Sequence, residues 1–535
     1  MAELADYPDV AEKAGFIDAK TLAHWLEDEN EIALIDVREA GRFGEGHAIL
    51  AVNIPYSRLE LDIARLVPRT GTRTVLIAED DAGAAKAVVA LRSVGYTDVQ
   101  ALTGGTAAWR NAGHLILQGV NVPSKAFAEF VEQVYHTPDI QPAELAALQR
   151  SGADLVLLDS RTVEEYRRFH VPGALSCPGS ELVYRFDDLV PSPETLVVIS
   201  CAGRTRGVMG AQTLINAGVP NRVVALSGGT QGWKLAGLPL TSVNEGEFFD
   251  ASDAARASAA GRAASLLQPF GIPVIDAGQL ARWQAQQDQT TYLFDVRTES
   301  EYLAGHFPAA LWAQGVQLIQ CLDQWAAVRK AKLVLTDNDG TRAIVTAHWL
   351  RQLGWDARVL RDAGERFTEI GHSPVSAPRL PKVSYVDAAT AAAKLTRGAL
   401  LVDASSSGEY RRLHPEGALW ANRSAPAALK PHLESATEVV VLAEDDNVAR
   451  LLALDLSGSA AVFVLRGGLA AWVAAGLPTE STPDVPADRE RLDFLFWLHD
   501  RHEGNAASSA AYLEWEAQLP ATLGSASVAG FRFPS

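Results

Sequence analysis

One sequence pattern occurs four times along the chain, and it sets the scale of any fold that the chain can adopt. An apolar stretch ends in Asp, a short polar segment follows, and a His comes next, in residues 34–47, 157–174, 293–310 and 401–418. A second apolar stretch follows each copy. A turn then closes each copy with an aromatic residue, at Trp109, Trp233, Phe367 and Trp472. Three anchors at matched spacing in four copies indicate tandem structural repeats.

Each repeat alternates apolar stretches with helical patterns, which is typical of an α/β fold. Strands that are apolar throughout their length indicate a parallel sheet covered on both faces, because the crossover helices bury both sides. We therefore predict an α/β protein of four tandem domains, each a parallel sheet flanked by helices. At about 150 residues per domain, 535 residues allow this number. The predicted domains span residues 14–122, 138–242, 270–376 and 382–480.

The segments between and after the repeats differ from them in composition. We expect connecting segments at residues 121–138, 242–269 and 376–381. The tail, residues 487–535, predicts two helices, one over 489–504 and one that begins after an N-cap at Asn505. The first carries an apolar stripe that includes Leu492 and Leu495. We expect the tail to dock on its own chain, with a homodimer formed through the tail as the alternative.

Only the second repeat places a cysteine after its second apolar stretch. Cys201 opens the run CAGRTRG, directly after residues 196–200 and before a helical pattern at 208–217. Loop N–H groups and a helix N-terminus stabilise an anionic sulfur, and nearby arginines add positive charge. We therefore predict that Cys201 is a nucleophilic thiolate. The substrate-binding candidates are the loop residues Ala202, Gly203, Arg204, Thr205, Arg206 and Gly207.

Several other residues are candidates for a role in structure or in substrate binding. Asp159, Arg161 and His170 have counterparts in the first repeat, which lacks the thiol, so we assign them structural roles. Arg185 could reach the mouth of the site and is a further substrate-binding candidate, with a solvated surface arginine as the alternative. We expect Cys177 to be a packed small hydrophobe, with a resolving thiol as the alternative, and we place Cys321 in a core.

Charge and cysteine content limit the partners of the chain. A net charge of −18 argues against nucleic acid or an anionic membrane surface as the main partner. Three cysteines give no disulfide framework and favour a reducing compartment. The first residues lack the features of a leader, and no apolar run reaches about 18 residues. We expect a cytoplasmic protein that needs neither a metal nor a cofactor.

The ordered motifs resemble those of the rhodanese sulfurtransferases. Asp-x-Arg, Glu-Tyr, His-x-Pro-Gly-Ala, a Cys-led loop and Gly-Gly-x-x-x-Trp follow one another, and all five are intact in the second repeat. The resemblance covers residues 14–480 and implies five-stranded parallel sheets and transfer of a sulfane sulfur through a cysteine persulfide. The loop departs from the family pattern at Arg204, where Gly is usual. Two guanidiniums favour thiosulfate or an anionic persulfide as donor, with a thiol or cyanide as acceptor.

The resemblance implies one active and three inactive domains. Glu79, Asp337 and Glu444 occupy the Cys201 position, and a carboxylate cannot carry a persulfide. We expect their charges to lie at helix N-termini, where they stabilise the fold. A phosphatase is disfavoured because the arginine of that loop type would fall at Gly207. The other alternative is a non-enzymatic persulfide carrier or redox sensor that acts on a protein partner.

Overall fold

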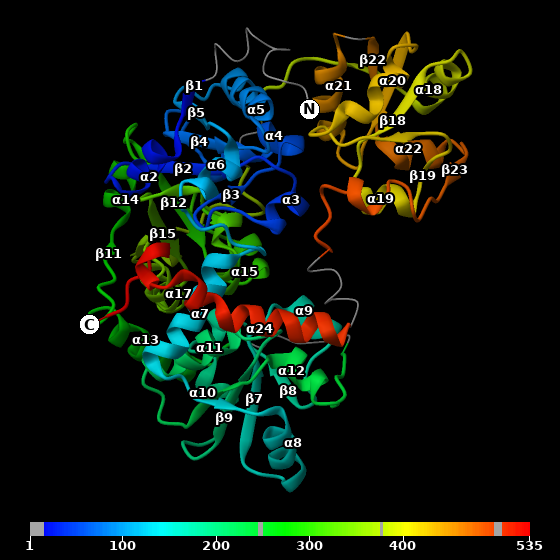
Figure 1. The fold of residues 1–535 in the computed structure, drawn as a ribbon. Coiled ribbons are helices and arrows are strands. Elements are labelled where there is room, and N and C mark those ends of the chain that lie inside the picture. Colours follow the sequence, from blue (N-terminus) through cyan, green and yellow to red (C-terminus); the bar gives the residue numbers. More distant parts are fainter. Residues whose placement is uncertain (1–14, 244–249, 375–377, 459, 497–504, 535) are drawn as a thin grey trace. The chain divides into compact units, whose positions relative to one another are not determined.

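Four parallel sheets form the framework in this computed structural model, which describes residues 15–243, 250–374, 378–458, 460–496 and 505–534 (Figure 1). The chain divides into two compact units. The first and fourth domains make up one unit, and the second and third domains, with the end of the tail, make up the other.

Every sheet repeats one strand order. In the first domain β2 carries β3 beside it, and the rest of the order is β1-β5-β4-β2. The other three sheets have five parallel strands each, in the orders β6-β10-β9-β7-β8, β11-β16-β15-β12-β13 and β17-β22-β21-β18-β20. The predicted α/β class and the four tandem parallel sheets are confirmed.

The strands are short and mostly buried. In the unit of the first and fourth domains they are β1 (Gly15–Ile17), β2 (Ile32–Asp36), β3 (Val52–Asn53), β4 (Thr74–Ile77), β5 (Val99–Leu102), β17 (Ser384–Val386), β18 (Leu400–Asp403), β20 (Leu419–Trp420), β21 (Glu438–Leu442) and β22 (Ala461–Leu465), with an antiparallel pair of β19 (His414–Pro415) and β23 (Thr479–Glu480). In the other unit they are β6 (Asp139–Ile140), β7 (Leu155–Asp159), β8 (Ala174–Ser176), β9 (Leu196–Ser200), β10 (Val223–Leu226), β11 (Val274–Ile275), β12 (Thr291–Asp295), β13 (Leu311–Trp312), β14 (Val328–Arg329), β15 (Lys332–Thr336) and β16 (Asp356–Leu360).

Helices connect the strands and cover the sheets. The first domain has α2 (Ala19–Glu27), α3 (Ala40–Glu45), α4 (Leu59–Leu66), α5 (Asp81–Ser93) and α6 (Gly105–Asn111), and the fourth has α18 (Ala388–Leu395), α19 (Ser407–Arg412), α20 (Lys430–Leu433), α21 (Asp446–Leu456) and α22 (Gly468–Ala474). The second domain has α7 (Val122–Tyr135), α8 (Pro142–Ser151), α9 (Val163–Arg168), α10 (Phe186–Leu189), α11 (Thr205–Asn216) and α12 (Gly229–Leu235), and the third has α13 (Asp253–Leu266), α14 (Ala277–Gln284), α15 (Glu299–Ala304), α16 (Gly315–Gln320) and α17 (Thr341–Gln352). The tail contributes α24 (Ala506–Leu523).

Ion pairs and hydrogen bonds join the domains within each unit. Arg423 of the fourth domain donates to both carboxylate oxygens of Glu60 in the first, at 2.6 and 2.8 Å. In the other unit, Arg342 of the third domain pairs with Glu181 of the second at 3.1 Å, and both side chains are buried. The indole of Trp349 donates to the hydroxyl of Thr213 at 2.8 Å.

The structure bears on two expectations for the segments outside the four domains. Residues 121–138 are not a plain linker, because they contain α7, which buries most of its length against the second and third domains. Of the first predicted tail helix, residues 497–504 lie outside the described part. The described residues before them form a short 3-10 helix at Asp488–Glu490 and a non-helical stretch over 491–495, and Phe496 is helical.

The second predicted tail helix is present. The Asn505 side chain accepts a hydrogen bond from the Ser508 amide, which is the N-cap that the sequence predicted. α24 packs against α7 and α12 of the second domain (Figure 1), so its apolar face is covered by its own chain. Within the described ranges, no helix is both long enough and apolar enough to cross a membrane.

Candidate active site

Cys201 lies between the end of β9 and the start of α11, at the carboxyl edge of the second sheet. The backbone N–H groups of Gly203 and Gly207 donate hydrogen bonds to its sulfur. A Cβ at Gly207 would lie 3.4 Å from Cys201 Sγ, so the missing side chain lets the sulfur approach the first turn of the helix closely. The loop therefore forms a cradle of backbone donors around the sulfur, as the sequence predicted.

The Gly-Gly turn holds this loop from behind. The Thr230 amide donates to the Cys201 carbonyl at 2.8 Å, and the Gln231 amide donates to the Ala202 carbonyl at 3.1 Å. Gly229 has φ +54°, and a Cβ there would come within 2.3 Å of the Cys201 carbonyl oxygen. Only glycine fits at this point, which explains the Gly-Gly pair of the repeat.

The thiol is almost completely enclosed. Cys201 is 2% exposed, and burial raises its pKa to about 11. The positive charge of Arg206 and the two amide hydrogen bonds lower the pKa, but burial outweighs them. The expected neutral-pH thiolate is therefore not the resting form of this covered site.

The two guanidiniums of the loop are held by carboxylates rather than left free. Arg204 donates to both oxygens of Glu129, at 2.7 and 2.9 Å, and also pairs with Glu132 of the same helix, α7. Arg206 donates to both oxygens of Glu165, at 2.5 and 2.7 Å. Burial alone would raise the pKa of Glu165, but Arg206 lowers it to about 2.

The other residues that the sequence singled out have partners inside the fold. Arg161 pairs with Asp159 at 2.7 Å, and His170 Nδ1 lies 2.9 Å from the Tyr166 carbonyl. The pair recurs as Asp36–Arg38 and Asp295–Arg297, at 2.6 and 2.7 Å, in domains without the thiol. Their predicted structural role fits this recurrence.

Arg185 and Cys177 are buried, and Cys321 is half-buried. Arg185 is buried and donates to Glu181 at 3.0 Å, so it is not a solvated surface arginine. Cys177 is fully buried, and burial raises its pKa far above the usual range for a thiol. Cys321 is half-buried at the end of α16 and is free, like the other two.

Sequence reasoning missed Glu129 and Glu132, and it also missed Glu516 of α24. One of its carboxylate oxygens accepts a hydrogen bond from the Thr205 hydroxyl at 2.8 Å and from the Tyr512 hydroxyl at 3.3 Å. A Cβ at Gly203 would lie 3.3 Å from the other oxygen. A glutamate on the buried stripe of α24, beside Tyr512, Leu519 and Leu523, was the available signal.

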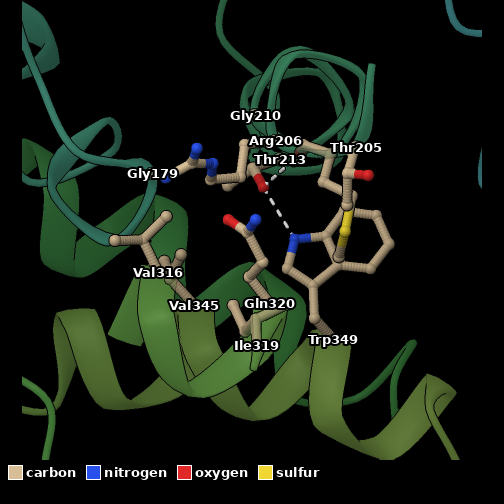
Figure 2. Close-up of a pocket in the computed structure, with 11 residues that line it drawn as sticks. Gly179, Thr205, Arg206, Gly210, Thr213, Val316, Ile319, Gln320, Val345 and Trp349 are labelled. Atoms are coloured by element: carbon tan, nitrogen blue, oxygen red, sulfur yellow. Dashed lines mark hydrogen bonds between the residues drawn. The ribbon is translucent and has the colours of Figure 1, made fainter. Parts of the chain in front are cut away.

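A small pocket lies beside the loop, between the second and third domains (Figure 2). The figure shows Thr205, Arg206 and Thr213 facing Ile319, Gln320 and Trp349 across it. Cys201 is not among the residues that line this pocket. Arg206 lines the pocket, and its positive charge also acts on the thiol.

The three loops without a cysteine differ from one another. Asp337 accepts hydrogen bonds from the backbone amides of Gly340, Arg342 and Ala343, at 2.5, 2.7 and 3.1 Å, at the start of α17. Glu79 and Glu444 are exposed, and the neighbouring Asp80 and Asp445 cap the helices instead. All three carboxylates lie close to a helix N-terminus, as predicted, but among the described hydrogen bonds only Asp337 accepts from helix amides.

Comparisons with known proteins identify the fold. The family model of the rhodanese-like domain matches residues 18–112, 141–236, 276–368 and 387–475. A crystal structure of thiosulfate sulfurtransferase from Pseudomonas aeruginosa is 39% identical, with a TM-score of 0.91, and the match covers 97% of this chain and 100% of that one.

Two curated relatives match only one domain's length. The uncharacterized protein slr1261 of Synechocystis sp. is 34% identical over 20% of this chain and 58% of its own length. The HTH-type transcriptional regulator Rv0324 of Mycobacterium tuberculosis is 34% identical over 19% of this chain and 43% of its own length. The chain thus spans about half the length of these two relatives. The family model matches more than half of the chain, so the chain belongs to the rhodanese-like family and carries four of its domains in tandem.

Proposed function

We propose that the protein is a thiosulfate sulfurtransferase of the rhodanese type, in which Cys201 alone carries the transferred sulfur. The observation that supports this most is the contact between the sulfur and the amides of Gly203 and Gly207. The same cradle in the third domain holds the carboxylate of Asp337, which cannot carry a sulfane sulfur. The similar Pseudomonas aeruginosa protein is described as a thiosulfate sulfurtransferase, which agrees with the proposal.

The proposed reaction is a double displacement. The Cys201 thiol loses its proton, and the thiolate attacks the outer sulfur of the donor. For thiosulfate, the S–S bond breaks and sulfite leaves with the electron pair, so Cys201 becomes a persulfide. An acceptor then attacks the outer sulfur, and the Cys201 thiolate leaves. Cyanide gives thiocyanate, and a thiol gives a new persulfide whose proton comes from that thiol.

The loop supplies the stabilisation that each step requires. Negative charge moves between the inner and outer sulfur atoms, and fixed N–H donors at Gly203 and Gly207 stabilise it without reorganisation. Arg206 adds a positive charge close to the thiol, and this charge lowers the pKa of Cys201. The backbone from Ala202 to Gly207 is the proposed binding surface for the outer sulfur.

We assign donor contact to Arg204 rather than to Arg206 or Arg185. The Arg204 side chain is 21% exposed, whereas that of Arg206 is 8% exposed and that of Arg185 is 10% exposed. Arg206 also has an equivalent, Arg342, in the third domain, which has no sulfur to serve. A residue that binds the donor is expected only in the loop that bears Cys201, and Arg204 meets that condition.

The test is an initial-rate comparison of thiosulfate, mercaptopyruvate and glutathione persulfide as donors, with cyanide and a small thiol as acceptors. We expect turnover with thiosulfate or the persulfide as donor. We also expect the wild-type protein to gain the mass of one sulfur atom after donor treatment and Cys201→Ser to gain none. A persulfide on Cys201 that no free acceptor removes would favour the second candidate, a carrier that serves a protein partner. The near-complete enclosure of Cys201 is the observation that keeps this candidate in view. A cytoplasmic location also remains part of the proposal, and cell fractionation tests it.

A further inference from the structure

A helix from outside the four domains covers the Cys201 loop. α24 packs against α7 and α12 of the second domain (Figure 1). The Leu513 side chain of α24 would lie 3.5 Å from a Cβ at Gly203 and lies 3.3 Å from the Cβ position of Gly228. The cover therefore touches both the loop that bears the thiol and the turn that supports it.

Glu516 is the charged group on the inner face of this cover. It is 2% exposed, and one carboxylate oxygen is held by Thr205 and Tyr512. Within the described ranges, the other oxygen has no hydrogen-bond partner, and it is the oxygen that faces Gly203. Because the Gly203 amide donates to Cys201 Sγ, this oxygen lies next to the place where the outer sulfur of a donor would bind.

The third domain offers an internal comparison. Thr341 occupies in its loop the position that Thr205 occupies in the armed loop. In the described structure, the Thr341 hydroxyl is buried without a hydrogen-bond partner, whereas Thr205 donates to Glu516. The tail thus satisfies the threonine of the armed loop and leaves its counterpart unsatisfied, so the contact is specific to the loop with the thiol.

The two arginines of the loop pair with other carboxylates, and Arg204 attracts Glu516 without forming an ion pair with it. Arg206 is paired with Glu165, and Arg204 is paired with Glu129 and Glu132. No guanidinium of the loop is paired with Glu516 in the described ion pairs. In a buried site, where water screens little, a carboxylate close to the reaction centre repels an incoming anion strongly.

We propose that Glu516 is a specificity-determining residue that disfavours reagents in proportion to the negative charge that they bring to Cys201. The part of this inference that concerns sulfur donors rests on the proposed function. The donor class that it favours carries at most one negative charge on its reacting group, such as a hydropersulfide. Thiosulfate, with two charges, would react more slowly than the cradle alone would permit.

Two alkylating reagents of nearly the same size test the charge effect without any sulfur transfer. Iodoacetate is an anion and iodoacetamide is neutral, and both form a bond from Cys201 sulfur to carbon while iodide leaves with the electron pair. The alkylation rate of Cys201 is measured by mass spectrometry of the Cys201 peptide in the full-length protein, so that Cys177 and Cys321 do not contribute. The ratio of the two rates cancels any change in thiolate fraction or in opening of the cover.

We expect the iodoacetate-to-iodoacetamide ratio to rise about tenfold in Glu516→Gln, because the amide keeps an acceptor for Thr205 and removes the charge. Glu514→Gln is the matched control, since Glu514 is exposed on the same helix and bonds to Gln518 at 3.2 Å. Glu516→Asp keeps the charge and is expected to keep a ratio close to that of the wild type. An unchanged ratio in Glu516→Gln, or an equal rise in Glu514→Gln, would overturn the proposal.

A second measurement separates this inference from the proposed function. In Glu516→Gln, kcat/KM for thiosulfate is expected to rise relative to that for glutathione persulfide. Failure of every donor to load Cys201, with the alkylation ratio still responding to Glu516→Gln, would refute the sulfurtransferase proposal and leave the charge effect standing. Faster alkylation by both reagents with the ratio of the wild type would show that α24 is a cover without charge selectivity, and would refute the proposal.

Discussion

The second and third domains build the same loop at the same edge of the same sheet and place different chemistry in it. Residues 201–207 read CAGRTRG and residues 337–343 read DNDGTRA. Both loops share Thr-Arg at the helix start, and in both the arginine pairs with a glutamate of the capping box, Glu165 or Glu301. The features common to both loops are therefore structural, and those found in one alone are the candidates for function.

The two loops differ at five of their seven positions, and three of these differences lie at the cysteine, the fourth and the last position. A thiol replaces a carboxylate as the group that receives the helix amides, Arg204 replaces Gly340, and Gly207 replaces Ala343. The carboxylate of Asp337 makes three hydrogen bonds with backbone amides and fills the cradle permanently. The thiol receives two such hydrogen bonds.

The largest expected effect is the loss of all sulfur transfer in Cys201→Ser. The equivalent positions in the other three domains are carboxylates, which form no persulfide. Initial rates and intact mass after donor treatment measure the effect. Residual transfer at a tenth of the wild-type rate would show that another residue carries sulfur, and would contradict the proposed difference between the loops.

Replacing the arginine that the two loops share should destabilise the protein more in the third domain than in the second. Arg342 is fully enclosed between Glu181 and Glu301, so Arg342→Met leaves buried carboxylates unpaired and is expected to cost about 3–5 kcal/mol of unfolding free energy. Arg206→Met should cost less, because the Glu165 side chain is 37% exposed and can be hydrated. Denaturant unfolding followed by circular dichroism measures both. Equal losses would contradict the difference in burial.

The pH dependence of thiol reactivity tests the enclosure of Cys201. Burial raises the pKa of the thiol to about 11, so below that pH the thiolate fraction increases about tenfold per pH unit. Alkylation of Cys201 by iodoacetamide is therefore expected to accelerate about 100-fold between pH 8 and pH 10. A rate that is already constant above pH 8 would mean that the loop holds a thiolate and that the cover does not raise the pKa.

Arg204→Ala tests the residue that is present in the armed loop alone. If Arg204 contacts the donor, kcat/KM for thiosulfate should fall by roughly 10- to 100-fold, the range for losing a hydrogen bond to a charged group. Lys is the matched substitution, because it keeps the charge and loses the bidentate geometry. No change in kcat/KM would mean that Arg204 serves only to tie the loop to α7.

The sequence was sufficient for the fold and for the place of the loop cysteine at the end of its strand, but not for the electrostatics of the site. Four strands that end in Asp and a lone cysteine in a loop are local signals, and the structure keeps both. The carboxylates that reach the loop from distant segments could not be found in the same way. Glu129 lies in a segment that was expected to be a linker, and Glu516 lies 315 residues beyond Cys201 in sequence, so only the folded chain brings them to the loop.

The burial of the thiol was beyond sequence reasoning for the same reason. The CAGRTRG run contains every element that stabilises a thiolate, but the pKa depends on what encloses the loop. Burial, to which α24 contributes, outweighs the amides and Arg206. Sequence patterns report donors and charges close in the chain, whereas desolvation is a property of the whole packed site.

The smallest expected effects concern the carboxylates that replace the thiol. Glu79 and Glu444 are exposed, so Glu79→Gln and Glu444→Gln should change the unfolding free energy by no more than about 0.5 kcal/mol. Asp337 is different, since burial raises its pKa to about 6 in the folded protein, above the usual 3.8. The folded state therefore favours the protonated acid. The resulting stabilisation is complete below about pH 4 and is lost as the pH rises through 6. Asp337→Asn should flatten this part of the profile of unfolding free energy against pH, whereas neither glutamine variant should alter it. Equal profiles for all three variants would show that the third loop does not bury its charge, and the comparison with the Cys201 loop would lose its basis.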